Sequence, residues 1–273
     1  MAGIPVGIAL PTSILSVEST LFLKSLRVHQ VARVSSIFGV ESVFFYREYS
    51  TPLEEYRRHR ELIEALWRYF FTPPYLRRRL VPRNPLLRYV GALPPIRLQA
   101  FDVKGKPTRG EVRAAYITLK EDGVTALLDN TEEYKATGEC SPGITMVRVV
   151  DTVERIAECI NGDYYMGPKL FFSNSLKRIL EDAESSVFKL ATDKTGAVPS
   201  LRELRKLRGR RILVLFGSPK RDLYEISAGE GFSILDYADA VWNTIPGQNV
   251  VSVRTEEAVA ATLSLLNYFL ALS

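Results

Sequence analysis

Three segments near the C-terminus combine residue types and spacings that could form a small-molecule site. In the first, an apolar run over 212–216 stops at Gly217. This pattern predicts a buried strand that opens into a loop, and Gly there lets a ligand approach the backbone. In the second, over 243–248, Pro246-Gly247 is a turn signal. Ligands of open α/β sheets bind beyond the carboxyl ends of strands, so this is where we expect a site.

The third segment, over 253–258, begins the final helix. Thr255 can cap it, Glu256 and Glu257 suit the positive helix end, and residues 258–272 are almost wholly apolar. Together, the three segments predict a pocket whose walls are mostly backbone. Such a pocket suits a flat heteroaromatic ligand but does not name it.

The remaining chain shows two textures, which predict two domains. Strands are expected over 6–10 and 43–46, and helices over 21–38, 53–71 and 173–183, with helix and loop through 209. Between 96 and 165, short alternating runs are cut by Gly and charged turns, which is typical of a small barrel. The predicted fold is an α/β domain with a mostly parallel sheet (1–92 and 166–273), interrupted by a β-barrel (93–165).

Positive charge is clustered along the chain, although the net charge is only +5 and the pI about 9.1. Basic runs lie at 57–60, 77–79 and 202–211. Such runs indicate either a phosphate-binding surface or helix faces paired with nearby carboxylates, and at 57–60 both interpretations stay open. Three consecutive Arg cannot all face carboxylates on one helix side, which favours RNA binding by Arg77, Arg78, Arg79 and Arg83.

The sequence argues against a metal site, several enzyme classes, and a membrane or secreted location. Cys140, Cys159, His29 and His59 lack metal-ligand spacing, so no metal is expected. The two cysteines are interpreted as ordinary buried thiols, with a disulfide possible in a hyperthermophile. Motifs for nucleotide hydrolysis, serine hydrolysis and dinucleotide binding are missing. Without a long apolar run or a charged leader, a cytoplasmic protein is expected.

The C-terminal segments resemble the SPOUT class of methyltransferases. The segment 30–43 resembles the first motif of that class, a helix carrying an Arg followed by a strand. The segments 74–80 and 91–95 resemble the linker of an archaeal and eukaryotic branch of RNA methyltransferases with an inserted OB-like barrel. This resemblance implies a trefoil-knotted C-terminal half, bound S-adenosylmethionine and a homodimer whose acceptor site could be shared between subunits.

The resemblance also assigns roles to residues. Arg33 matches the motif Arg that holds a phosphate or lowers the pKa of the acceptor, and is the predicted catalytic residue. Arg254 could contact the cofactor carboxylate or RNA, while Glu256 and Glu257 are interpreted as helix-end residues rather than as a general base. The predicted cofactor site comprises Leu215, Phe216, Gly217, Ser218, Asn243, Thr244, Ile245, Pro246, Gly247, Gln248, Val253, Arg254, Thr255 and Ala258.

These observations favour an S-adenosylmethionine-dependent RNA methyltransferase acting on ribosomal RNA, at a uridine ring nitrogen or a ribose 2′-OH. One alternative is an RNA-binding assembly factor that keeps the fold without transferring methyl groups. A small-molecule-binding α/β protein is a weaker alternative, because it leaves the basic run 77–79 and the barrel unexplained.

Overall fold

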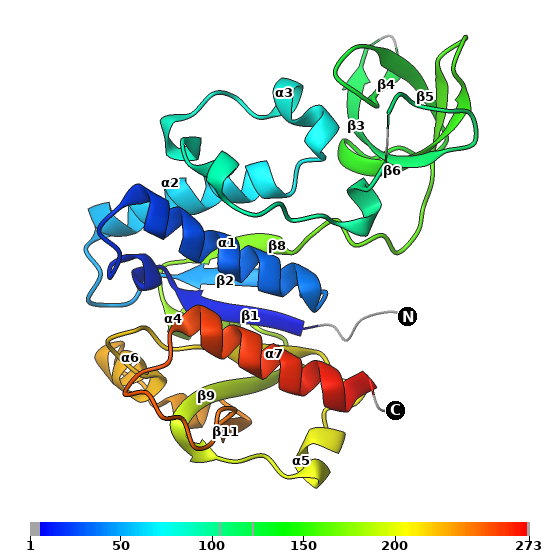
Figure 1. The fold of residues 1–273 in the computed structure, drawn as a ribbon. Coiled ribbons are helices and arrows are strands. Elements are labelled where there is room, and N and C mark those ends of the chain that lie inside the picture. Colours follow the sequence, from blue (N-terminus) through cyan, green and yellow to red (C-terminus); the bar gives the residue numbers. More distant parts are fainter. Residues whose placement is uncertain (1–5, 104, 122, 272–273) are drawn as a thin grey trace. The chain divides into compact units, whose positions relative to one another are not determined.

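The computed structural model describes residues 6–103, 105–121 and 123–271 (Figure 1). It divides into two compact units. The sheet unit comprises the described residues up to Leu66, Arg88–Leu93 and those from Gly167 onward; the barrel unit comprises Trp67–Leu87 and Pro94–Met166. Helix α2 (Leu53–Phe70) runs across the division between Leu66 and Trp67.

The sheet unit is built on six parallel strands in the order β11-β9-β10-β1-β2-β8. All four residues of β10 are buried, as expected for a parallel strand that is covered on both faces. The predicted parallel α/β sheet is therefore confirmed. The strands are β1 (Val6–Pro11), β2 (Ser42–Tyr46), β8 (Lys169–Ser173), β9 (Phe188–Ala197), β10 (Ile212–Leu215) and β11 (Ala240–Trp242).

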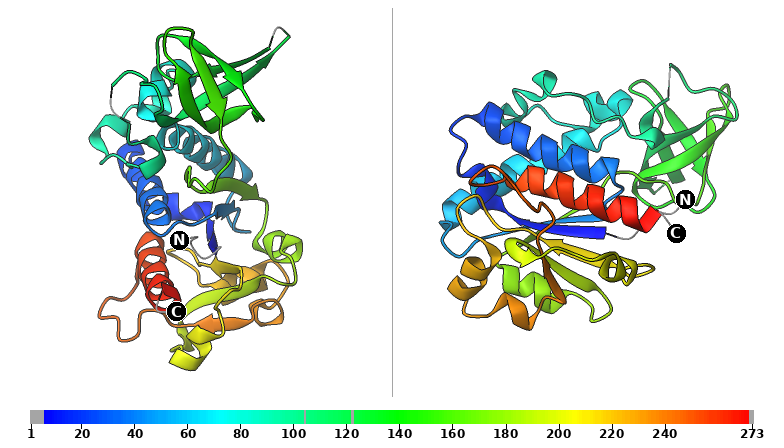
Figure 2. Two further views of the ribbon diagram at one scale, coloured as in Figure 1. Left: turned by 90° about the vertical axis from the view of Figure 1, so that its right-hand side faces the viewer. Right: turned by 60° about the horizontal axis from the view of Figure 1, so that its bottom comes forward.

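Helices cover both faces of this sheet. Buried residues of α4 (Leu176–Asp182) and α6 (Leu223–Gly229) form one core cluster with Ala9, Leu213 and Leu215. Helices α1 (Leu21–Ile37) and α7 (Thr255–Ala271) contact each other on the opposite face (Figure 2). The short helix α5 (Leu201–Arg205) contacts α7. No described helix is long and apolar enough to span a membrane.

The barrel unit contains a closed five-stranded barrel in the order β3-β4-β5-β7-β6. Its interior is filled by small and branched side chains such as Ala115, Ile117 and Val147, as expected for a small barrel. The predicted β-barrel is therefore confirmed. Its strands are β3 (Val112–Lys120), β4 (Gly123–Leu127), β5 (Glu133–Thr137), β6 (Gly143–Asp151) and β7 (Ile156–Cys159). The short helix α3 (Arg77–Leu80) also belongs to this unit.

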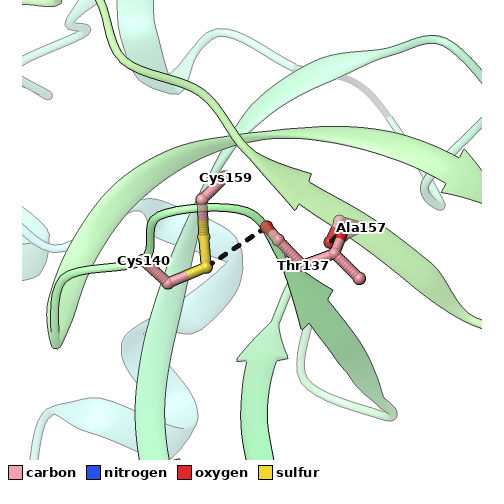
Figure 3. Close-up of a disulfide and its surroundings, with 4 residues drawn as sticks. All are labelled: Thr137, Cys140, Ala157 and Cys159. Carbon is pink, nitrogen blue, oxygen red and sulfur yellow. Dashed lines mark hydrogen bonds between the residues drawn. A yellow bond between two sulfur atoms is a disulfide. The ribbon is translucent and has the colours of Figure 1, made fainter.

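The two cysteines form a disulfide rather than the expected buried thiols. Cys140, in the β5–β6 loop, is bonded to Cys159 at the end of β7, with Cα atoms 5.4 Å apart (Figure 3). Both residues are only half-buried, on the rim of the barrel core. The buried-thiol interpretation was wrong because it relied on how often free cysteines are buried, whereas the barrel brings these two together.

Strand β9 is a second difference from expectation. We predicted helix and loop from 184 to 209, but this stretch contains β9, which pairs with β10 on one side and with β11, the edge strand, on the other. Leu190 and Ala191 are fully buried there. The apolar part of β9 is short and does not alternate with polar residues, and charged and hydroxyl residues flank it. The sequence pattern therefore does not predict a strand there.

Candidate functional site

A cavity of about 340 Å³ opens beyond the carboxyl end of β10 and beside the second half of β9. It lies wholly within the sheet unit. Its lining comes from residues 192–194 of β9, residues 216–222 after β10 with Glu225 of α6, four residues of the segment 243–248 after β11, and five residues of the segment 251–258 where α7 begins. A ligand site at this edge is what an open parallel sheet predicts.

Most residues of the predicted cofactor site meet in this cavity. Leu215 does not line it, because it is fully buried within the sheet. Arg254 lies outside the lining and approaches Glu18 at 3.8 Å. Pro246 and Gly247 shape the turn without facing the cavity. The predicted residues that do line it are Phe216, Gly217, Ser218, Asn243, Thr244, Ile245, Gln248, Val253, Thr255 and Ala258.

The loop after β10 requires the glycine that the sequence places there. A Cβ at Gly217 would lie 2.8 Å from the carbonyl oxygen of Arg221, closer than side chains tolerate. That same carbonyl accepts a hydrogen bond from the Ser218 N–H at 2.8 Å. The Ser218 hydroxyl in turn accepts one from the Arg221 N–H at 3.0 Å. Gly217 therefore serves the close folding of the loop on itself.

Thr255 does not cap α7 as expected. Its hydroxyl donates to the carbonyl oxygen of Gly217 at 3.2 Å, which ties the start of α7 to the loop after β10. The capping partner is Glu257, whose carboxylate accepts a hydrogen bond from the Arg254 N–H at 3.0 Å. The cap prediction was wrong in its residue, because α7 begins at Thr255 itself and the preceding carbonyl, that of Arg254, accepts the first helical hydrogen bond from the Ala258 N–H at 2.9 Å.

Glu48 and Arg221 were not predicted, yet they fix the cavity wall. Glu48, just beyond β2, is 1% exposed. Its carboxylate accepts hydrogen bonds from Arg221 at 2.7 Å, Ser13 at 2.6 Å and Ser50 at 3.0 Å. Arg221 lines the cavity and also lies over the Tyr49 ring. A carboxylate two residues beyond a predicted strand, at the edge where ligands bind, is the signal that could have identified Glu48.

The charged side chains around the cavity differ in their hydrogen bonds and ion pairs. Asp193 accepts hydrogen bonds from Thr195, and Asp222 forms a capping box with Glu225 at the start of α6. Lys194 and Lys220 are exposed, and among the described residues neither ammonium lies within ion-pair distance of a carboxylate. The lining thus carries three carboxylates, of Asp193, Asp222 and Glu225, and three cationic groups, of Lys194, Lys220 and Arg221.

Arg33 and Glu256 occupy different environments on the helices α1 and α7. Arg33 is exposed on α1 and is not among the cavity-lining residues. Glu256 is 5% exposed and forms an ion pair with Arg27, which also binds Glu18 at 2.6 Å. Burial raises the pKa of the Glu256 carboxyl, and Arg27 opposes that shift. Glu256 thus joins α7 to α1 rather than facing the cavity.

The predicted RNA-binding arginines separate into two groups. Arg77 is half-buried in the barrel unit, with its guanidinium 4.3 Å from the Tyr69 ring centre and bonded to the Thr72 carbonyl. Burial lowers the pKa of Arg77. Arg78, Arg79 and Arg83 are exposed, and no ion pair is formed by them within the described chain.

Carboxylates pair with several residues of the run 57–60, and with Arg211 at the end of the run 202–211. Arg57 is 2.6 Å from Glu54 and Arg60 is 2.8 Å from Glu64. Arg211 pairs with Glu184 at 3.2 Å. These contacts support the ion-pair interpretation for much of the 57–60 run.

Comparison with known proteins identifies the family. Residues 5–266 match the family described as "Putative RNA methyltransferase". The chain belongs to this family. An uncharacterized protein of Halobacterium salinarum is 29% identical over 262 residues, covering 86% of this chain and 89% of the relative. An uncharacterized protein of Haloarcula marismortui is 25% identical over 258 residues, with the same shares covered.

Membership of this RNA methyltransferase family confirms the resemblance drawn from the sequence motifs. Among solved structures, one described as "Structural insights into the 2-OH methylation of C/U34 on tRNA" aligns with a TM-score of 0.42 and 12% identity. It covers 100% of this chain and 94% of that one. A score this low carries no inference about substrate or site.

Proposed function

We propose that this member of the RNA methyltransferase family binds S-adenosylmethionine in the 340 Å³ cavity and transfers its methyl group to RNA. The supporting observation is the convergence of three sequence segments on one cavity at the carboxyl ends of parallel strands. Its volume lies within the range of about 300–1,000 Å³ common to small-molecule sites.

The cavity lining fits the cofactor chemically. Ile245, Val253 and Ala258 offer apolar surface for the adenine ring. Ser218 and Thr244 also line the cavity, with hydroxyl groups held in place by hydrogen bonds to Arg221 and Thr262. When bound, the sulfonium of S-adenosylmethionine would supply an activated methyl group. The chain itself must then bind, orient and exclude water, which the closed loop after β10 and its tie to α7 are suited to do.

The acceptor side of the proposal rests on the resemblance. It gives ribosomal RNA as the substrate, with a uridine ring nitrogen or a ribose 2′-OH as the acceptor. Arg33 would hold a phosphate or favour loss of the acceptor proton. Because Arg33 does not line the cavity of its own chain, the proposal places it in an acceptor site shared between two copies of a homodimer with a knotted C-terminal half.

The remaining positive groups are proposed to bind the RNA backbone. Exposed and unpaired within the described chain, Arg78, Arg79 and Arg83 can neutralise phosphates, whereas Arg77 is engaged inside its own unit. Phosphate binding of this kind supplies affinity without reading sequence.

Calorimetric titration with S-adenosylmethionine tests the proposal. Filling the cavity at Gly217 would be a poor test, because any side chain there collides with the loop itself. Ala258→Phe fills the cavity from α7, while Ala261→Phe adds the same volume to the same helix outside the lining. We expect the wild type and Ala261→Phe to bind the cofactor, and Ala258→Phe to lose at least about tenfold in affinity.

Transfer of a labelled methyl group to RNA is the second measurement. If the wild type binds the cofactor but methylates no RNA, the protein is an RNA-binding assembly factor rather than an enzyme. Failure of wild-type protein to bind S-adenosylmethionine would overturn the proposal as a whole.

A further inference from the structure

A second cavity, of about 430 Å³, lies in the sheet unit at the edge strand β8. Its lining is rich in aromatic side chains from β2, α2 and β8, and it includes two arginines. The members used below are Phe44, Phe171, Phe172, Arg60 and Arg178. None of them belongs to the first cavity or to the predicted site.

Phe171 is the unusual residue of this cavity. Its ring stacks on Phe44, with centroids 4.9 Å apart and planes 19° from parallel, yet the residue is 42% exposed. Phe44 covers one side of the ring, so the exposed part is the side that Phe44 leaves open. Edge strands are normally protected by charged residues or proline, and an exposed aromatic ring there promotes aggregation. The packing of the sheet does not explain why a phenylalanine occupies position 171.

Two guanidinium groups accompany the aromatic rings. Arg60 lies 5.0 Å from the centre of the Phe172 ring, and Arg178 lines the cavity from α4. Each pairs with a carboxylate one helical turn away, Arg60 with Glu64 at 2.8 Å and Arg178 with Asp182 at 3.4 Å. Exposed pairs of this spacing contribute only about 0.3–0.5 kcal/mol, so a phosphate can displace them.

We propose that this cavity binds an unpaired nucleobase of single-stranded RNA, stacked on Phe171, with the adjoining phosphates held by Arg178 and Arg60. The proposal rests on the proposed function only for the choice of RNA. An open aromatic face beside arginines is the combination by which proteins bind single-stranded nucleic acid. A peptide strand added to the β8 edge would bind through backbone groups and would need neither arginine. The site is a second RNA contact, distinct from the cavity proposed for methyl transfer.

A tryptophan reporter tests the stacking directly. Phe171→Trp keeps an aromatic platform, and base stacking on it should quench its fluorescence when a short oligouridine is added. Leu235→Trp is the matched control, because Leu235 is 62% exposed and lines neither cavity. The two native tryptophans contribute the same background to both variants. Quenching at 171 but not at 235 is expected; equal responses, or none, overturn the proposal.

Binding of labelled oligouridine, measured by fluorescence anisotropy, gives the affinity. We expect Phe171→Ala to weaken binding about 5- to 100-fold, from the usual contribution of base stacking, and Leu235→Ala to change it less than twofold. Arg178→Gln should also reduce the slope of log affinity against log salt by about 0.7, the value for one phosphate contact to a single strand. An unchanged slope and affinity would overturn the phosphate contact.

Titrating the same variants with S-adenosylmethionine separates this inference from the proposed function. Cofactor binding that persists while Phe171→Ala leaves RNA affinity unchanged rejects the base site alone. Quenching at position 171 without any cofactor binding rejects the methyl-transfer proposal alone.

Discussion

The carboxylate of Glu48 accepts a hydrogen bond from the guanidinium of Arg221 across 173 residues of sequence, at 2.7 Å. Glu48 follows β2, whereas Arg221 closes the loop after β10, so the bond joins two strand ends at the edge of the first cavity. With the Thr255–Gly217 bond, it holds this loop from two sides. The loop that carries Gly217 is therefore positioned before any ligand binds.

Replacing Glu48 by Gln should destabilise the protein and weaken cofactor binding together. Hydrogen bonds to charged groups contribute about 1.5–3 kcal/mol, and the amide leaves Arg221 without its countercharge. Urea unfolding measures the first effect and calorimetric titration the second. Glu54→Gln is the control, because Glu54 pairs with Arg57 at the surface and should change stability by less than about 0.5 kcal/mol. Equal effects of the two variants would contradict the role given to Glu48.

The Glu256–Arg27 ion pair gives a second prediction. Both side chains are less than 10% exposed, and Arg27 keeps its second partner Glu18 when the Glu256 charge is removed. Glu256→Gln should therefore cost about 1.5–3 kcal/mol in the free energy of unfolding, the usual contribution of a hydrogen bond to a charged group. The neighbouring Glu257→Gln, at an exposed position, should cost about 1 kcal/mol or less. If thermal unfolding shows the two substitutions to be equivalent, the pair does not stabilise the α1–α7 contact.

His59 predicts a loss of stability in mild acid. Burial lowers the pKa of His59 to about 4, Lys24 and Arg58 add to the shift, and Glu55 opposes it. Between pH 6.5 and 4 the unfolded chain therefore binds more protons at this residue than the folded protein. Stability is fully present above pH 6.5 and falls as the pH drops toward 4.

The expected loss from this one residue between pH 7 and 5 is about 1–2 kcal/mol. Urea unfolding at both pH values, on the wild type and on His59→Leu, measures it. The variant should lose less stability over this interval than the wild type. Parallel losses would show that other groups carry the pH dependence.

Arg77 and Arg78 should respond differently to replacement by alanine. Arg78→Ala should weaken RNA binding and lower its salt dependence by about one phosphate, without changing the melting temperature. Arg77→Ala removes the contacts with Tyr69 and Thr72, and should lower the melting temperature instead. Filter binding over a salt series, together with thermal melts, distinguishes the two effects. Equal losses of RNA affinity in the two variants would contradict this prediction and show that Arg77 also binds RNA.

The disulfide between Cys140 and Cys159 should stabilise the barrel unit. It closes a loop with a sequence separation of 19, for which the chain-entropy estimate is about 3 kcal/mol. Reductant should therefore lower the melting temperature of the wild type. A Cys140→Ser/Cys159→Ser variant should melt at that lower temperature with or without reductant, and a reductant effect on this variant would contradict the assignment.

The sequence predicted where the first cavity would lie better than how it is held. Short-range sequence patterns predict the strand 212–216, the turn at Pro246-Gly247 and the start of the final helix, and all three are found at the cavity. No short-range pattern predicts the hydrogen-bond partner of the Thr255 hydroxyl. The sequence does not show that the helix begins one residue earlier than a Thr255 cap requires, nor that the Thr255 hydroxyl lies near the Gly217 carbonyl, because both depend on how the chain folds.

Ion pairs between residues far apart in the sequence could not be predicted either. Glu48 and Arg221 become partners only because β2 and β10 both flank β1, which no sequence spacing expresses. Strand β9 was missed for a related reason. Its burial comes from its neighbours β10 and β11, whereas its own residues 189–194 include four polar and only two apolar side chains.

The strand order also constrains how the protein can be synthesised. Strand β1 leaves the ribosome well before its neighbour β10, which begins only at Ile212. At translation rates of about 5–20 residues per second, the backbone N–H and C=O groups along one edge of β1 wait roughly 10–40 s for their partner strand. The barrel strands, contiguous from Val112 to Cys159, can pair during that interval. Chains whose synthesis stops before β10 would contain a folded barrel and also an unpaired edge of β1. Such an edge promotes aggregation, so we expect these chains to bind chaperones.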